Sequence, residues 1–504
     1  MELELQHQTL EGYRPVFDSL LAQEETLETI VPDAFPDIAR IVSAESTILL
    51  KDKEAVEGSV RLTGSACVTV LYIPESEPGP RALEVSIPFQ CAQDCPKVRS
   101  GCVIHAAAHC PAADARAINP RKLLVRASIS IWVTAYGAES LELTCDAGGC
   151  QEGCLEKRFI QCKSFTICDV LEKPFLFSDV LRLPASKPAM EELLCTRAQV
   201  GMMDAKVIGK KLVFKGDILL SVLYRSSGGV CPARFELPYS QIIDLNASVE
   251  DGEPEVSVLL KGLDYHLSDG ELEVSVEALA QAALWAQRDV TLMSDVYCTA
   301  CPLDAERAPC TLCAMAERGG QKETARQFCE SGIPAKQVLD CSAIVESVSS
   351  QEEGGGITYT AQANVTVLYL SEDDALCCVS YKIPVSCNVV VPEGGSCRCR
   401  CRTTGETTAV PVTGGLEVRF DAEFSWTSTR EEKVPCVSSV RRGTAAESGS
   451  ARPSVILRMV GDGESLWEIA KSCGSTIRDI CGANGLQGEE VPKGTLLLIP
   501  TKRA

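Results

Sequence analysis

The sequence predicts a mainly β, multidomain protein: three tandem β-rich, sandwich-like repeat domains followed by a small α+β module of βααβ order. Runs of β-branched and aliphatic residues end in Leu-Tyr in three distant segments, SACVTVLYIP, DILLSVLYRS and NVTVLYLSED. Such runs are typical of strands. Near the C-terminus, two segments with apolar residues at helical spacing lie between two short strand-like runs. Each repeat is expected to contain several short antiparallel strands, with one helix near its start.

The repeats are found by spacing. The tyrosines of the three segments, Tyr72, Tyr224 and Tyr369, are 152 and 145 residues apart. A proline precedes each tyrosine by 36, 36 and 35 residues; these prolines are Pro36, Pro188 and Pro334. A second strand-like run in each unit ends at a tryptophan, at Trp132, Trp285 and Trp426. We interpret these aromatic markers as core residues of one repeated domain and assign them no catalytic role.

These markers give the predicted domain organisation. It comprises an N-terminal segment (1–30), repeat 1 (31–144), repeat 2 (169–296), repeat 3 (325–436), a flexible linker (437–454) and the terminal module (455–500). Cysteine-rich connectors, 145–154 and 297–313, join the repeats. The small polar residues of VSSVRRGTAAESGSARPS predict the flexible linker.

Charge and hydropathy limit the function classes. The 504 residues carry a formal net charge of -21, with 69 acidic against 48 basic side chains. This balance argues against nucleic acid and against an anionic membrane surface as partners. The first residues lack a basic segment followed by an apolar core, so no signal peptide is expected. No apolar run approaches about 18 residues, so no membrane span is expected, and the predicted location is cytoplasmic.

The 27 cysteines raise two alternatives. Cys298, Cys301, Cys310 and Cys313 form CxxC-x8-CxxC, a pattern that can hold zinc, although the loop is shorter than in most zinc ribbons. The other interpretation is free or later-oxidised thiols, and it leaves the protein without a metal. CRCRC (397–401) would place three thiols on one side of a strand, which suits cross-linking. His105 and His109, with Cys110, offer a second and weaker metal alternative.

Motifs of the common enzyme classes are missing from the sequence. There is no phosphate-binding GxxxxGK[ST] loop, no GxGxxG after a strand and no GxSxG elbow. We therefore expect no catalytic residues and no cofactor. A pair of carboxylates acting on a glycoside leaves no local motif and stays open. Three copies of one β domain favour a scaffold over an enzyme.

The terminal module resembles the LysM family through GDGESLWEIA, Thr476 to Ile480, Asn484-Gly485-Leu486, the PKG turn and Leu496 to Pro500. The resemblance implies a βααβ fold that binds N-acetylglucosamine polymers between two loops. Carried onto this sequence, the loops are 461–466 and 484–490. Trp467 is expected in the module's own core. The implied binding residues are Gly461, Asp462, Gly463, Glu464, Ser465, Leu466, Asn484, Gly485, Leu486, Gln487, Gly488 and Glu489.

Tandem repeats with the VLY strand followed by one such module resemble the SipL-like spore-coat morphogenetic proteins. The resemblance is strongest in the terminal module, the PDIARIV opening and the VTVLY strands. It implies a scaffold in the mother-cell cytoplasm that is recruited to the forespore surface. Its terminal module would dock onto the coat basement-layer ATPase, stage IV sporulation protein A. The alternative is a protein that binds peptidoglycan or cortex glycan. A third interpretation is an enzyme targeted by the module.

Overall fold

The computed structural model describes residues 3–149, 154–246, 249, 251–353, 355–443 and 453–501. Strands make up nearly all of the regular structure, and the two α-helices of the described residues both lie in the terminal module. Neither helix is long and apolar enough to cross a membrane. The mainly β fold class is confirmed. The helix expected near the start of each repeat is not found, and that segment leads into an extended strand instead.

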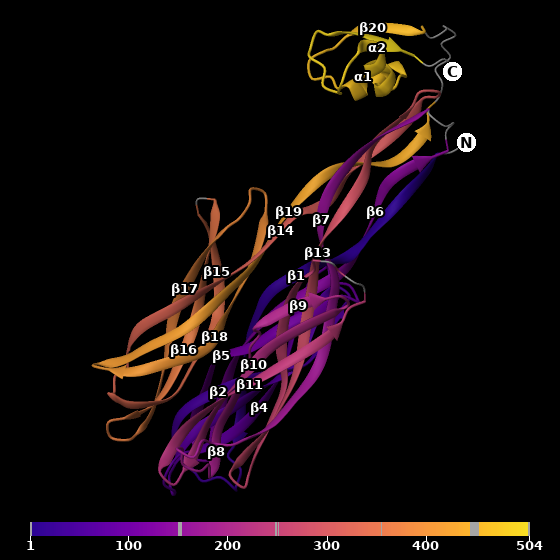
Figure 1. Cartoon of the computed structure of the whole chain (residues 1–504). Helices are drawn as coiled ribbons and strands as arrows, with labels where there is room; N and C mark the ends of the chain where they lie inside the picture. Colours follow the sequence, from indigo (N-terminus) through magenta and orange to yellow (C-terminus); the bar gives the residue numbers. More distant parts are fainter. Residues whose placement is uncertain are drawn as a thin grey trace.

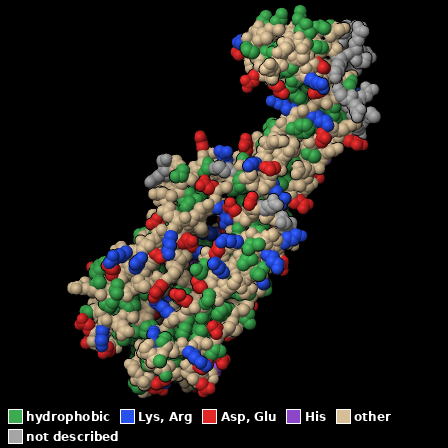
Figure 2. All heavy atoms as spheres, viewed as in Figure 1, with side chains coloured by type: hydrophobic (Ala, Val, Ile, Leu, Met, Phe, Trp, Pro, Cys, Tyr) green, Lys and Arg blue, Asp and Glu red, His purple; other side chains and the backbone are tan. Residues whose placement is uncertain are grey.

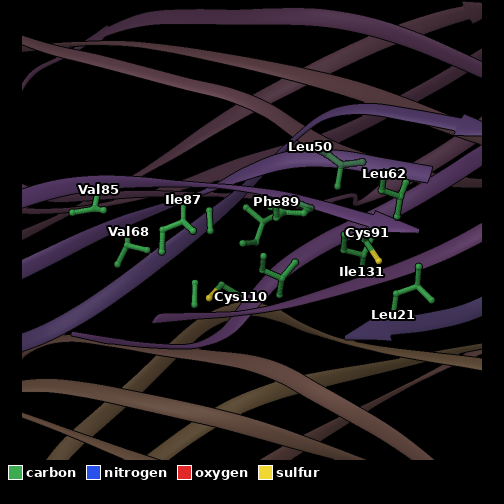
Figure 3. Close-up of a cluster of buried hydrophobic side chains, with 14 of the residues drawn as sticks. Leu21, Leu50, Leu62, Val68, Val85, Ile87, Phe89, Cys91, Cys110 and Ile131 are labelled. Carbon is green, nitrogen blue, oxygen red and sulfur yellow. The ribbon is translucent and has the colours of Figure 1, made fainter. Parts of the chain in front are cut away.

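The first unit is a two-sheet sandwich. One sheet has the order β2 (Ile38–Val56), β3 (Ser59–Pro74) and β4 (Arg81–Asp94). The facing sheet is formed by β1 (Glu4–Ile30), β6 (Lys122–Gly148) and β5 (Val103–Asn119). Alternate residues of both sheets meet in one apolar core, in which Cys91 and Cys110 lie beside Phe89 and Ile131 (Figure 3). Reduced cysteine is packed here as a small apolar residue.

The second and third units repeat this arrangement. In unit 2 the sheets are β8 (Glu192–Val200), β9 (Asp204–Ile208), β10 (Lys211–Ser226) and β11 (Gly229–Asp244), facing β7 (Leu155–Leu181), β13 (Glu271–Cys298) and β12 (Glu253–Ser268). In unit 3 they are β15 (Ala335–Glu353), β16 (Gly356–Ser371) and β17 (Leu376–Val390), facing β14 (Leu303–Glu330), β19 (Gly415–Arg442) and β18 (Ser396–Val412). Each unit has its own core.

The strands β1, β6, β7, β13, β14 and β19 are 27 or 28 residues long, far above the usual strand of about six. Each unit therefore begins with a long strand. The predicted span of repeat 1 leaves this strand out, and the predicted spans of repeats 2 and 3 start within it. Residues 4–30 are the first strand of unit 1, not a separate segment. Of the predicted connectors, residues 145–148, 297–298 and 303–313 lie in strands, and residues 150–153 lie outside the described residues. Strand β19 extends to Arg442. Residues 444–452 of the predicted linker lie outside the described residues.

The distal halves of these six strands form a stalk that rises from the sandwiches to the terminal module (Figure 1). All six strands contribute to its apolar core, which includes Leu10, Leu143, Ile160, Leu292, Leu312 and Cys436. Strands β1 and β7 pair at Tyr13 and Ile167, which joins the long-strand sheets of units 1 and 2 into one. The stalk is stable because each long hairpin buries one apolar face against the other two.

The three sandwiches pack around a common axis. The leucine before each marker tyrosine, Leu71, Leu223 and Leu368, lies in one shared apolar cluster. Beside it, the Arg197 guanidinium on β8 donates to Glu45 on β2 at 2.6 Å and to Asp340 on β15 at 3.0 Å. One side chain from each unit thus meets at the axis. The contacts between units close a ring. Arg81 of unit 1 pairs with Glu192 of unit 2, and Arg234 of unit 2 pairs with Asp340 of unit 3. The Leu376 carbonyl of unit 3 accepts a hydrogen bond from Arg40 of unit 1.

Candidate functional site

The terminal module has the predicted βααβ order. It consists of β20 (Val455–Met459), α1 (Leu466–Cys473), α2 (Ile477–Asn484) and β21 (Leu496–Pro500). Helix α1 starts with a capping box, in which Ser465 and Glu468 accept each other's backbone N–H. The helices end at Gly474 and Gly485, both at a φ of 66° that glycine adopts without strain. Gly482 lies within the second helix.

The first predicted ligand loop (461–466) lies beside the PKG turn that follows the second loop. The Lys493 ammonium contacts the Asp462 carboxylate at 2.9 Å, and Gly494 N–H donates to Val460 C=O at 2.9 Å. Asp462 and Gly463 in the first loop and Gly485, Gln487, Gly488 and Glu489 in the second are exposed. These six residues are the part of the predicted groove that a ligand can reach directly.

The other predicted groove residues support the loops. Leu466 is buried in the module core, and Leu486 packs against that core. The Asn484 amide bridges its helix to β21, donating to Ile480 and Leu498 carbonyls and accepting from Leu498 N–H. Glu464 accepts from Gly461 N–H and from Arg458, and Ser465 caps α1. Substituting Leu466 or Asn484 would therefore disturb folding as well as binding.

The sheet of the module has an exposed outer face that sequence reasoning missed. Strands β20 and β21 alternate, so that Leu497 and Ile499 are buried under the helices. The opposite side chains, which we call the aliphatic face, are Val455, Leu457, Met459, Leu496 and Leu498, with exposed fractions of 48, 66, 63, 60 and 38%. Leu457 pairs with Leu498, and Met459 with Leu496, across the two strands. The available signal was that VILRM and LLLIP are apolar at nearly every position, which puts aliphatic side chains on both faces of a two-stranded sheet.

Helix α1 joins the module to the stalk. The buried Asp295 carboxylate on β13 accepts from Trp467 Nε1 at 2.8 Å and from Lys471 at 2.7 Å, and pairs with Arg307 of β14 at 2.8 Å. Tyr297 packs edge-on against the Trp467 ring, with centroids 4.9 Å apart, and its hydroxyl donates to Ser475 C=O. Trp467 is a core residue, as expected, but that core includes Tyr297 of the stalk. β20 lies on the side of the module away from the stalk (Figure 1).

The predicted zinc alternative is not assembled. Cys298 ends β13, Cys301 lies in the following turn, and Cys310 and Cys313 lie on β14. Within the described part of the chain, no three His, Cys, Asp or Glu side chains gather as a metal site would need. Burial, with the neighbouring Cys436 and Cys162, raises the pKa of Cys310 to about 11.

The histidine alternative has a similar outcome. His105 and His109 lie on strand β5, not on a helix. Burial lowers the pKa of His105 to about 3 and that of His109 to about 4, so both rings are neutral. His105 packs edge-on against Tyr136 with ring centroids 5.0 Å apart. Their side chains face the neighbouring units, with His105 hydrogen-bonded to backbone of Leu171 in unit 2 and His109 to backbone of Val345 in unit 3.

CRCRC occupies β18, and its two residue types have separate roles. Cys399 and Cys401 are buried in the core of unit 3. Arg398 and Arg400 point the other way and pair with Asp18 of unit 1 at 3.2 and 3.0 Å. The motif therefore holds two units together through its arginines. Burial of two of its three thiols opposes the expected use in cross-linking.

Comparison with protein families supports the sequence resemblance. Residues 37–111 and 189–268 match the family model described as SipL, SPOCS domain, and residues 459–500 match the LysM domain. The two SPOCS matches cover the corresponding parts of units 1 and 2, from the strand before the marker tyrosine onwards. No curated protein matches the chain. Both matched domains are binding modules, and the LysM domain is of the peptidoglycan-binding type.

Proposed function

We propose that this sporulation protein, with its SipL-type SPOCS domains and LysM module, is a non-enzymatic scaffold that docks onto the coat basement-layer ATPase, stage IV sporulation protein A. In this proposal it acts in the mother-cell cytoplasm at the forespore surface and helps coat assembly. The three units and the stalk position the module, and the module makes the contact.

The observation that carries the proposal is the aliphatic face. Contiguous exposed apolar side chains mark protein interaction sites. A glycan needs polar groups in the loop groove and gains nothing from five aliphatic side chains on the opposite sheet face. The module's junction with the stalk leaves this face free, because Asp295 and Tyr297 contact α1. The surface available to a partner therefore favours a protein.

The second candidate is glycan binding in the groove. It is favoured by the exposed loop residues Asp462, Gln487 and Glu489, which lie where the LysM resemblance places the ligand. An N-acetylglucosamine polymer would use these loops and leave the aliphatic face empty.

Pull-down of the full chain separates the two. One arm offers the purified ATPase and the other offers purified peptidoglycan. The variants are Leu457→Asp with Met459→Asp on the aliphatic face, Gln487→Ala with Glu489→Ala in the groove, and Val390→Asp as a control. Val390 is an exposed aliphatic residue of unit 3, so its substitution matches the chemistry at a distant place.

We expect the ATPase to retain the parent, groove and control chains and to lose the aliphatic-face variant. Retention on peptidoglycan alone, lost in the groove variant, would contradict the scaffold proposal and establish the glycan alternative.

A further inference from the structure

A cleft of about 580 Å³ lies where the module meets the stalk. Its stalk wall is formed by parts of β7, β13, β14 and β19, and its module wall by α1. The volume is in the range of sites that hold small ligands or peptide side chains, and domain junctions are common places for such sites. This cleft is separate from the groove loops and from the aliphatic face.

Cationic side chains outnumber carboxylates in this cleft, although the chain as a whole is strongly acidic. Arg158, Arg307 and Lys471 line it, against Asp295 and Glu468. Arg307 and Lys471 share the single Asp295 carboxylate. Arg158 is the cross-strand neighbour of Asp295, yet among the described residues its guanidinium forms no ion pair. Positive charge in the cleft is therefore only partly compensated.

Apolar groups lie beside these charges. Phe159, next to Arg158 on β7, lines the cleft and is 46% exposed. Ile160, Pro435 and the buried Trp467 complete the apolar part of the wall. Ser294 donates its hydroxyl to Arg158 C=O at 3.1 Å and so holds the backbone that presents both Arg158 and Phe159. The site thus combines an exposed arginine on a hydrogen-bonded stretch of backbone with an exposed aromatic ring.

We propose that this junction cleft binds an acidic peptide segment of a partner protein. Carboxylates would pair with Arg158 and Arg307, because the guanidinium fork matches carboxylate geometry. An apolar side chain of the same segment would pack on Phe159. Since α1 supplies one wall, the site exists only while the module is docked on the stalk. Binding of the segment therefore stabilises the docked module.

The test uses the full chain and a fluorescein-labelled peptide, Gly-Glu-Asp-Leu-Glu-Asp-Gly, followed by fluorescence anisotropy. A second peptide carries Gln and Asn in place of Glu and Asp. Arg158→Gln and Phe159→Ser change exposed parts of the cleft wall. Arg182→Gln, just beyond the other end of β7, is the matched control because Arg182 is exposed and pairs only at the surface.

We expect the acidic peptide to bind and the amide peptide to bind at least about fivefold more weakly. Arg158→Gln and Phe159→Ser should each weaken binding by a similar factor, and Arg182→Gln should not. Raising the salt from about 50 to 300 mM should also weaken it. Absence of binding, equal binding of both peptides, or full binding by both cleft variants would overturn the proposal. None of these readouts depends on the aliphatic face or on the ATPase.

Discussion

Trp467 donates its indole N–H to the carboxylate of Asp295, 172 residues away in the chain and 2.8 Å away in space. One residue lies on the first helix of the LysM module and the other on the longest strand of unit 2. Asp295 is only 4% exposed and satisfies Trp467, Lys471 and Arg307 together. Together with Tyr297, this carboxylate therefore holds the module on the stalk.

Asp295→Asn should release the module without unfolding it. The amide cannot compensate Lys471 and Arg307, and removing one partner of a buried pair costs about 3 kcal/mol. Hydrogen exchange of α1 and small-angle scattering should report an undocked module. Asp289→Asn, on an exposed position of the same strand, is the control and should change neither. A scattering profile unchanged in Asp295→Asn would show that other contacts hold the module.

Docking of the module on the stalk should depend on pH only in the acidic range, where Asp295 becomes protonated. Burial alone raises the pKa of Asp295, but the hydrogen bonds and charges of Lys471, Trp467 and Arg307 outweigh it, so the net pKa is lowered. A lowered pKa in the docked state stabilises docking above the ordinary value and loses this effect as the pH falls through the docked value. Docking should thus be constant from about pH 8 to 5 and weaken below about pH 4. Weakening already at pH 6, measured by Trp467 fluorescence in a chain with the other tryptophans replaced by Phe, would contradict this.

Arg197→Met should destabilise the ring of units. Glu45 would be left largely buried without a cation, and Asp340 would keep only the more distant Arg234 at 3.6 Å. Burial already raises the pKa of Glu45. Breaking such a pair costs about 3–5 kcal/mol, which urea unfolding can measure. Adding Glu45→Gln and Asp340→Asn should recover part of the loss because the unpaired charges are removed. Lys382→Met, at an ion pair whose lysine is well exposed, should cost less than about 1 kcal/mol.

The thiols of Cys399 and Cys401 should resist alkylation. Burial raises the pKa of each to about 12, so almost no thiolate is present at about pH 8. Iodoacetamide treatment of the folded chain, followed by peptide mass spectrometry, should leave both unlabelled. The same reaction in guanidinium chloride should label them fully. Rapid labelling in the folded chain would mean that β18 opens and would restore a role in cross-linking.

The spacing of the repeat markers was readable because it reflects a contact. Tyr72 and Tyr224 donate their buried hydroxyls to the carbonyls of Pro36 and Pro188, 36 residues earlier in both cases. Tyr369 donates to Ile333 at the same separation, and Pro334 follows one residue later. A buried hydroxyl needs a hydrogen-bond partner. The separation of 36 residues between the tyrosine and the accepting carbonyl therefore recurs in all three units, although in unit 3 the proline is the residue after the acceptor. The markers predicted three units correctly for this reason.

The stalk and the junction could not be found in this way. Strand β1 pairs with β6, from Ile30 with Lys122 to Glu4 with Gly148, and a long strand carries no local mark of its distant partner. Asp295 is a lone acidic residue in the apolar run TLMSDVYC, and that break was its only signal. The loop positions of the LysM module were predictable from its motif. Which of them face solvent depended on packing, as Leu466 and Asn484 show.

The contacts that close the ring of units have a consequence for synthesis of the chain on the ribosome. Glu45 and Arg197 are made long before Asp340 of the third unit, and Asp18 waits still longer for Arg398 and Arg400. A nascent chain that has only two units therefore exposes charged and aliphatic surface meant for the third. Completion of the body therefore comes late in synthesis, and a chain truncated before Arg398 and Arg400 would carry open surfaces that chaperones and proteases recognise.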